Sequence, residues 1–130
     1  LCPAATGISH HINPHGDVEP CPPIQFARER IEDGTDLETL FAGSEFLRRF
    51  RELASDQSRG CILLENPQLL KEFMEQQDAR DTTGRGTGFN ELGAMSTLPG
   101  HHQPDREIPE KSWVYRFAKK HWFFGFGAYG

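Results

Sequence analysis

A chain of 130 residues can form one domain with a modest core, or one part of a longer protein. Its hydrophobic content of 36% is low for a large core. The formal net charge of -5, with most basic residues alternating with acidic ones, excludes a basic face for nucleic acid. Since no apolar run has the length of a bilayer span, we expect no membrane partner either.

The first predicted element is a β-hairpin over residues 7–21. Ile8 and Ile12 would lie on one side of its first strand, because alternate residues of a strand share a face. The segment NPHGD provides the turn, in which Gly16 can adopt a positive φ. A connection rich in proline and charge follows over residues 21–35.

Two helices are predicted next, over residues 36–43 and 44–56. Asp36 is placed as the N-cap of the first helix and Gly43 as its end. Ser44 is placed as the N-cap of the second helix, whose apolar residues recur at helical spacing. These helices and the hairpin predict a small α+β fold.

The second half of the chain is less regular. The apolar run RGCILLEN, residues 59–66, predicts a strand or an extended segment. A helix over residues 66–79 is indicated by Asn66 at its N-cap and Pro67 at its first position. Residues 80–109 lack any period, so we expect a long irregular loop that wraps something, serves a site or is disordered.

The C-terminal segment, residues 110–130, begins as a helix and ends in an aromatic and glycine-rich tail. Trp113 and Phe117 share one helix face, which we expect to belong to the core. The remaining HWFFGFGAYG holds more aromatic surface than a small core can absorb. We therefore predict that this tail packs on a missing domain or a partner.

The cysteine count constrains the chemistry. Three cysteines are an odd number, which argues against a closed disulfide framework, although one pair and a free thiol remain open. The sequence starts at Leu1, with no initiator Met and no signal peptide before the first cysteine, so we expect a piece of a longer, cytoplasmic protein. Thiols stay reduced in that compartment and often bind metal there.

The hairpin predicts where the cysteines meet. Antiparallel pairing would bring Cys2 and Cys21 together, and the helices that follow could return Cys61 to the same end. Thiolates on irregular backbone suit an iron–sulfur cluster or Zn²⁺. No CxxC pair is present, so inert buried thiols are the other interpretation of these three residues.

The segment CPAATGISHHINPHGDVEPCPPIQFA resembles the start of the SPASM or twitch auxiliary-cluster domain of radical S-adenosylmethionine (SAM) enzymes. Domains of that family begin with a cysteine, continue into a β-hairpin and carry a Gly-x-x-x-x-Cys element, here Gly16 to Cys21. LETLFAGSEFLRRFREL is similar to the helical stretch after that hairpin. RGCILLENPQLLKEF is similar to the later cysteine segment of shorter members, so the resemblance covers residues 1–78.

This resemblance implies that Cys2, Cys21 and Cys61 ligate an auxiliary [4Fe-4S] cluster. The later, closely spaced cysteines of the full SPASM pattern do not occur, which favours a twitch-like domain with one cluster. Four irons then share three cysteines. The fourth iron would be open to substrate or a small ligand, or held by a residue outside this chain, or held by one of three histidines: His10, His11 or His15.

The resemblance also limits what this chain can do alone. The CxxxCxxC loop that binds the SAM-cleaving cluster is absent, so this chain by itself should not be catalytic. The partner would be a radical SAM barrel, upstream or on another polypeptide, that binds SAM and an unknown substrate. The predicted organisation is an auxiliary-cluster domain over residues 1–79, the irregular loop over 80–109 and the aromatic segment over 110–130.

Two other functions remain open from the residues themselves. A structural zinc module would use Cys2, Cys21, Cys61 and either His10 or His11 as four tetrahedral ligands. A metal-free interaction domain would bind a partner through its aromatic tail.

Overall fold

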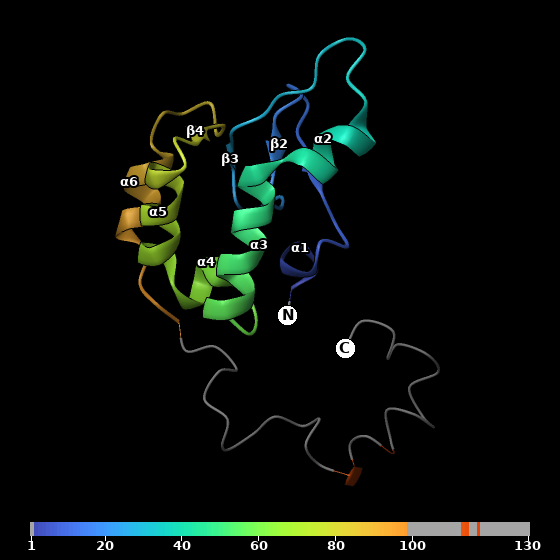
Figure 1. Cartoon of the computed structure of the whole chain (residues 1–130). Coiled ribbons are helices and arrows are strands. Elements are labelled where there is room, and N and C mark those ends of the chain that lie inside the picture. The colour runs from blue at the N-terminus through green and yellow to red at the C-terminus, as the bar shows by residue number, and fades with distance from the viewer. Residues whose placement is uncertain (1, 99–112, 115–116, 118–130) are drawn as a thin grey trace.

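The computed structural model describes residues 2–98, 113, 114 and 117. Its helices are short and its strands shorter, as Figure 1 shows. The elements in chain order are α1 (Pro3–Thr6), β1 (His11–Ile12), β2 (Val18–Glu19), β3 (Phe26–Ala27), α2 (Leu37–Gly43), α3 (Glu45–Gln57), α4 (Ile62–Glu65), α5 (Pro67–Gln76), β4 (Arg80–Asp81) and α6 (Gly88–Ala94).

Within the described residues, the strands form two antiparallel two-stranded sheets. β1 pairs with β2 in the predicted hairpin, and His11 lies opposite Glu19. β3 pairs with β4, although some fifty residues of chain separate them, and Phe26 lies opposite Asp81. The small α+β class predicted from the sequence is confirmed.

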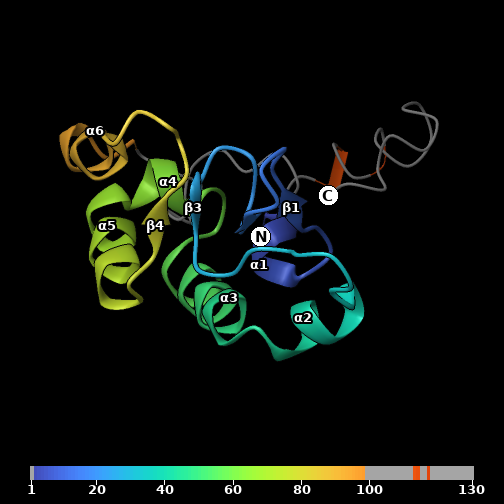
Figure 2. The ribbon, with the colours of Figure 1, turned by 90° about the horizontal axis from the view of Figure 1, so that it is seen from above.

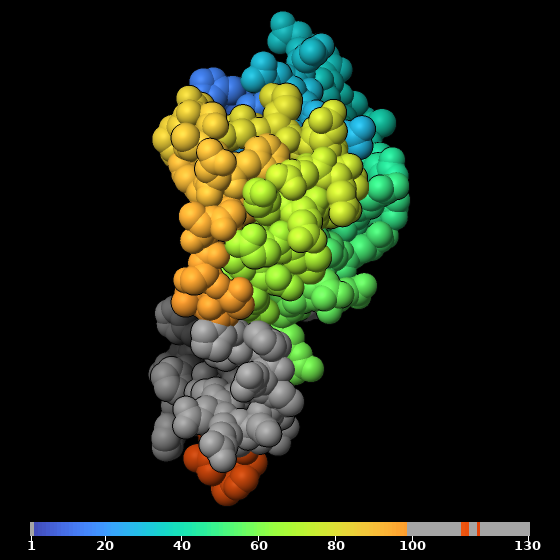
Figure 3. Space-filling view, turned by 90° about the vertical axis from the view of Figure 1, so that its left-hand side faces the viewer, coloured from blue at the N-terminus to red at the C-terminus, as the bar shows by residue number. Residues whose placement is uncertain are grey.

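α3 lies between α1 on one side and α5 on the other (Figures 1 and 2). α5 and α6 pack side by side, and Figure 3 shows them together on one face. Side chains from these helices and from the strands form one core. Its buried members are Ala4, Ala5, Val18, Ile24, Phe26, Phe46, Leu47, Phe50, Ala54, Ile62, Leu70, Phe73, Met74, Ala79 and Leu92.

The helix starts follow the predicted capping residues. The Asp36 side chain accepts a hydrogen bond from the Thr39 N–H at the start of α2. The Ser44 hydroxyl accepts one from the Leu47 N–H at the start of α3. Each bond satisfies a backbone N–H that has no partner within the helix, so these two predicted caps are confirmed. Asn66 stands at the N-cap position of α5 as predicted, but its side chain makes no cap hydrogen bond. Pro67 begins α5 as expected.

Two segments differ from the prediction. Residues 59–66 contain the helical turn α4 and no strand, because the Cys61 carbonyl accepts hydrogen bonds from the Leu64 and Glu65 N–H groups. Residues 80–109 were expected to be irregular, but they contain β4 and α6. β4 exists because β3 lies beside it, and a pairing across so many residues leaves no local pattern in the sequence.

The N-terminal segment also differs. α1 occupies the start of the chain, with Pro3 at its first position, where the sequence predicted only the approach to a hairpin. Ile8 is 82% exposed and lies before β1, so it does not share a strand face with Ile12. The hairpin is therefore shorter than residues 7–21.

Most of the predicted aromatic segment, residues 110–130, lies outside the described residues. Trp113 and Phe117 are helical and 72% and 54% exposed, so the prediction that they belong to the core is wrong. The described core is filled by the aromatic and aliphatic side chains of α3 and α5. Among the described residues, none of the helices has the length and apolar character of a membrane span.

Candidate metal centre

The three cysteines lie at the ends of three separate elements. Cys2 is the N-cap residue of α1, and Cys61 is the N-cap residue of α4. Cys21 follows β2, between two prolines. All three are partly buried and free, and none lies inside a strand or a helix. Each cysteine therefore lies at the end of an element, on backbone that does not follow a helix or a strand.

Two of the thiols sit at helix starts with extended backbone. Cys2 has φ -71° and ψ 153°, and Cys61 has φ -110° and ψ 114°. Their carbonyl groups accept the first helical hydrogen bonds, from Ala5 N at 3.0 Å and from Leu64 N at 3.0 Å. Neither thiol caps its helix through any hydrogen bond to a described residue. Thus the backbone of each cysteine is held while its sulfur is not used in folding the helix.

The pKa of the Cys21 thiol depends on its burial and on the charges around it. Its pKa is raised from the ordinary 9.0 to about 11, chiefly because burial disfavours the thiolate. A hydrogen bond from the Ile24 backbone lowers the pKa and partly offsets this effect. The negative charges of Cys61 and Cys2 raise it further. The charges of Cys61 and Cys2 therefore reach Cys21, although the three residues are far apart in the sequence.

A buried carboxylate lies beside this group. Glu19 is 1% exposed and its charge also raises the pKa of Cys21. Its Oε1 accepts hydrogen bonds from Asn13 Nδ2 at 3.0 Å and from the Thr82 hydroxyl at 2.5 Å. Its Oε2 lies 3.5 Å from His11 Nε2. These partners satisfy the carboxylate and join the hairpin to the segment after β4.

A second buried carboxylate holds the hairpin from the other direction. Asp17 is 3% exposed, and its Oδ1 accepts from Arg30 Nε at 3.0 Å and from Arg80 Nη2 at 3.1 Å. Its Oδ2 accepts from Asn13 Nδ2 at 3.1 Å. Burial acts to raise the pKa of Asp17, but the hydrogen bonds from Arg30, Asn13 and Arg80 outweigh it, and the pKa is lowered. Asp17 is thus ionised and fixes the strand that leads to the second cysteine.

The three histidines considered as fourth ligands have different surroundings. His10 is exposed, and its Nε2 lies 2.6 Å from Arg51 Nη2 and accepts from it, since arginine only donates. Burial and the charge of Arg51 lower the pKa of His10. His11 faces the buried Glu19, and His15 lies exposed in the hairpin turn. Of the three, His11 has the partner that also acts on Cys21.

These donors can be compared with the two kinds of metal site that the sequence suggests. Among the described residues, no group of three or more His, Cys, Asp or Glu side chains is arranged to hold a metal ion. A zinc ion requires its thiolates to converge on one point, about 2.3 Å from each sulfur. In a four-iron cluster, each thiolate binds a different iron, so the sulfurs stand farther apart.

No role was predicted from the sequence for Glu19 beside Cys21, for Glu65 before Cys61 or for Asp17 in the hairpin. Both Val18 and Glu19 are buried, so the alternation that would mark an inward-facing residue is absent from β2. The short spacing from Glu19 to Cys21 is the only local signal for it. Glu65 gave no signal, because its partners are backbone groups of a loop that sequence patterns do not describe.

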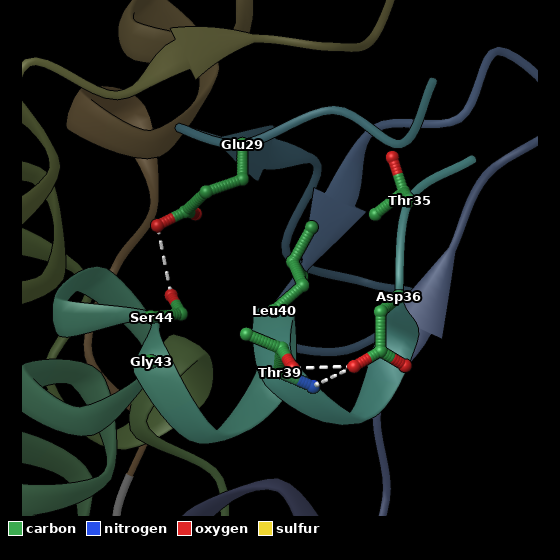
Figure 4. Close-up of a pocket in the computed structure, with 7 residues that line it drawn as sticks. All are labelled: Glu29, Thr35, Asp36, Thr39, Leu40, Gly43 and Ser44. Atoms are coloured by element: carbon green, nitrogen blue, oxygen red, sulfur yellow. Dashed lines mark hydrogen bonds between the residues drawn. The ribbon is translucent and has the colours of Figure 1, made fainter. Parts of the chain in front are cut away.

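A pocket of about 500 Å³ lies along α2, away from the cysteines (Figure 4). The Ser44 hydroxyl donates to Glu29 Oε1 at 2.8 Å, and Asp36 accepts from the backbone N–H and the hydroxyl of Thr39. Glu29 Oε2 is buried with no hydrogen-bond partner among the described residues. Because solvent does not reach this atom, a ligand in the open pocket would not reach it either. The polar groups here serve as helix caps.

Comparisons of the chain with protein-family models, with curated proteins and with solved structures found no match.

Proposed function

We propose that this chain is an auxiliary iron–sulfur domain of a radical SAM enzyme, with Cys2, Cys21 and Cys61 as ligands of a [4Fe-4S] cluster. The observation that supports the proposal is that three free, partly buried cysteines from distant segments stand at the ends of short elements, at the starts of α1 and α4 and after β2. The charges of Cys61 and Cys2 also raise the pKa of Cys21. Thiolates are the ligands that iron–sulfur clusters use.

The order of elements supports the twitch-like form of this proposal. An antiparallel hairpin separates Cys2 from Cys21, and α2 and α3 separate Cys21 from Cys61. This is the order that the sequence resemblance implies. The described cysteines number three, which suits one cluster with one iron that has no cysteine ligand.

The negative charges around Cys21 would favour a bound cationic group. Cys21 must lose its proton to become a ligand, and the charges of Glu19 and the other two cysteines oppose that loss in the free protein. A bound cationic group reverses the balance, because the same negative charges then attract it. When bound, such a cluster supplies one-electron transfer or an iron that accepts substrate.

The SAM-cleaving barrel and the substrate belong to the partner in this proposal. An auxiliary domain would hold substrate near the barrel or pass electrons between them. The exposed Trp113, Val114 and Phe117 offer apolar surface of the kind found at interfaces between domains.

Anaerobic reconstitution of the full chain with iron and sulfide tests the proposal. We expect near-stoichiometric cluster iron and sulfide, the broad visible absorption of an iron–sulfur cluster and a loss of both in Cys21→Ala. Thr6→Ala is the matched control, because Thr6 is an exposed neighbour of Cys2 whose hydroxyl bonds to the Pro3 carbonyl. This variant should keep the iron content of the parent.

The other outcomes separate the remaining functions. A colourless protein with one tightly bound zinc would overturn the cluster and identify a structural zinc module. A folded protein that takes up neither metal would overturn both metal sites and leave the metal-free interaction domain. Circular dichroism of each variant shows whether a lost metal reflects a lost ligand or a lost fold.

A further inference from the structure

The two residues before Cys61 are bound by the side chain of Glu65. Glu65 is 7% exposed, and its Oε2 accepts a hydrogen bond from the Arg59 N–H at 3.0 Å. Its Oε1 accepts one from the Gly60 N–H at 2.8 Å. Both donors belong to the two residues that lead into Cys61. One carboxylate therefore fixes the approach of the chain to this cysteine.

The backbone of Glu65 also bonds to this loop. Its N–H donates to the Cys61 carbonyl at 2.9 Å, as part of the turn α4. Residues 59, 60 and 61 are thus all bonded to residue 65. A loop held at three consecutive positions has little freedom to move its last side chain, the thiol of Cys61.

Gly60 shows how close this contact is. A Cβ atom at position 60 would lie 2.7 Å from Glu65 Oε1, which is closer than real Cβ atoms approach such an atom. Since φ of Gly60 lies outside the left-handed region, its backbone conformation does not require glycine. A larger residue at position 60 would have to displace the carboxylate, because the carboxylate occupies the space of a side chain.

A buried carboxylate is an unfavourable group with which to hold a loop, because its charge must be desolvated. Burying a charge is unfavourable unless hydrogen bonds compensate for it, and a serine or asparagine at a helix start can accept a backbone N–H without a charge. A carboxylate has two oxygens and can accept from two adjacent N–H groups at once. Its use here indicates that the position of both residues before Cys61 matters.

We propose that Glu65 is a positioning residue for Cys61, which holds residues 59–61 and thereby fixes the position of the Cys61 thiol. The identity of the ligand that the Cys61 thiol binds rests on the proposed function. The position of the thiol does not, because it can be measured in the protein without iron. The positioning role of Glu65 and the proposed cluster function can therefore be refuted separately.

The test uses three variants of the full chain in its reduced, iron-free form. Glu65→Gln keeps the size of the side chain, but its amide NH₂ cannot accept a backbone N–H, so one of the two bonds is lost. Gly60→Ala keeps the carboxylate and forces it away from the loop. Glu52→Gln is the matched control, since Glu52 is an exposed residue of α3 that pairs with Arg48.

The readout is the alkylation rate of each cysteine, resolved by mass spectrometry at a temperature where every variant is folded. We expect a several-fold change in the rate of Cys61 in Glu65→Gln and Gly60→Ala, with the rate of Cys2 unchanged. Glu52→Gln should match the parent at all three cysteines. A role in general stability would change all three rates together or none.

Two results would overturn the proposal. One is a Cys61 rate in Glu65→Gln and Gly60→Ala equal to that of the parent. The other is unfolding of both variants under conditions in which the parent is folded, because Glu65 would then serve the whole fold and not one thiol. The same variants after reconstitution should lose iron to a chelator faster than the parent. If the parent binds no iron while the alkylation result holds, the proposed function fails and the positioning role stands.

Discussion

The ionisation of Cys21 offers the sharpest check on the geometry of the three thiols. Its pKa of about 11, against the ordinary 9.0, means a thiolate fraction about a hundredfold below that of an ordinary thiol near neutral pH. Burial is the largest cause, and the charges of Cys61 and Cys2 add to it, in that order. Replacing either neighbour by serine should therefore lower the pKa of Cys21, and Cys61→Ser should lower it more than Cys2→Ser.

The double variant, Cys2→Ser with Cys61→Ser, separates the effect of the two cysteine charges on the pKa of Cys21 from the effect of burial. Removing both charges leaves burial and the nearby Glu19, so the pKa of Cys21 should fall from about 11 but stay above 9.0. The assay is alkylation of the reduced, iron-free protein across the alkaline range, with each cysteine resolved by mass spectrometry. The same protein in urea provides the ordinary reference value.

Two results would refute the reasoning. If Cys21 titrates at the same pH in the parent and in the double variant, the thiols do not act on one another, and the argument for a shared site is lost. If Cys21 titrates near its urea value in the parent, the site is not buried as described. The folded state must be monitored throughout, because it holds the Cys21 proton more tightly than the unfolded state. The resulting stability is complete below about pH 9 and is lost as the pH rises toward 11.

Two further predictions concern the frame that carries the site. Ser44→Ala removes the cap of α3 and the hydroxyl that donates to Glu29. The free energy of unfolding, measured by urea titration, should therefore fall by about 2 kcal/mol. A change below about 0.5 kcal/mol would contradict the capping role. Asp17→Asn removes the charge that Arg30 and Arg80 share, and should cost about 2 kcal/mol at neutral pH, since both arginines are half exposed. Because folding lowers the pKa of Asp17, its contribution is complete above about pH 4 and is lost as the pH falls through the lowered value, so parent and variant should converge in acid. An undiminished difference at low pH would show that the effect is not due to the charge.

The local features of this chain were predictable where one residue acts on its immediate neighbours. Asp36 and Ser44 cap their helices because a short polar side chain can reach an N–H three residues ahead, whatever the rest of the chain does. The hairpin turn at Gly16, where φ is 83°, was predictable for the same reason. Element boundaries were less well predicted, since Ile8 lies outside the strand assigned to it.

The features that failed depend on partners far away in the sequence. β4 forms only because β3 lies beside it, and residues 80 and 81 carry no strand pattern of their own. α4 is the exception, because the predicted extended segment is replaced by a local turn in which the Cys61 carbonyl accepts from the Leu64 and Glu65 N–H groups. The apolar face of Trp113 and Phe117 was assigned to the core by periodicity, but periodicity does not say what a face packs against.

The sequence by itself determined the fold class, two of the helix caps and the hairpin turn. The tertiary structure decided that the charges of Cys61, Cys2 and the buried Glu19 reach Cys21, and that Glu65 holds the loop of Cys61. The physical reason is the range of each interaction. Caps and turns act over a few residues along the chain, whereas burial and charge act through space and exist only once distant segments have packed together.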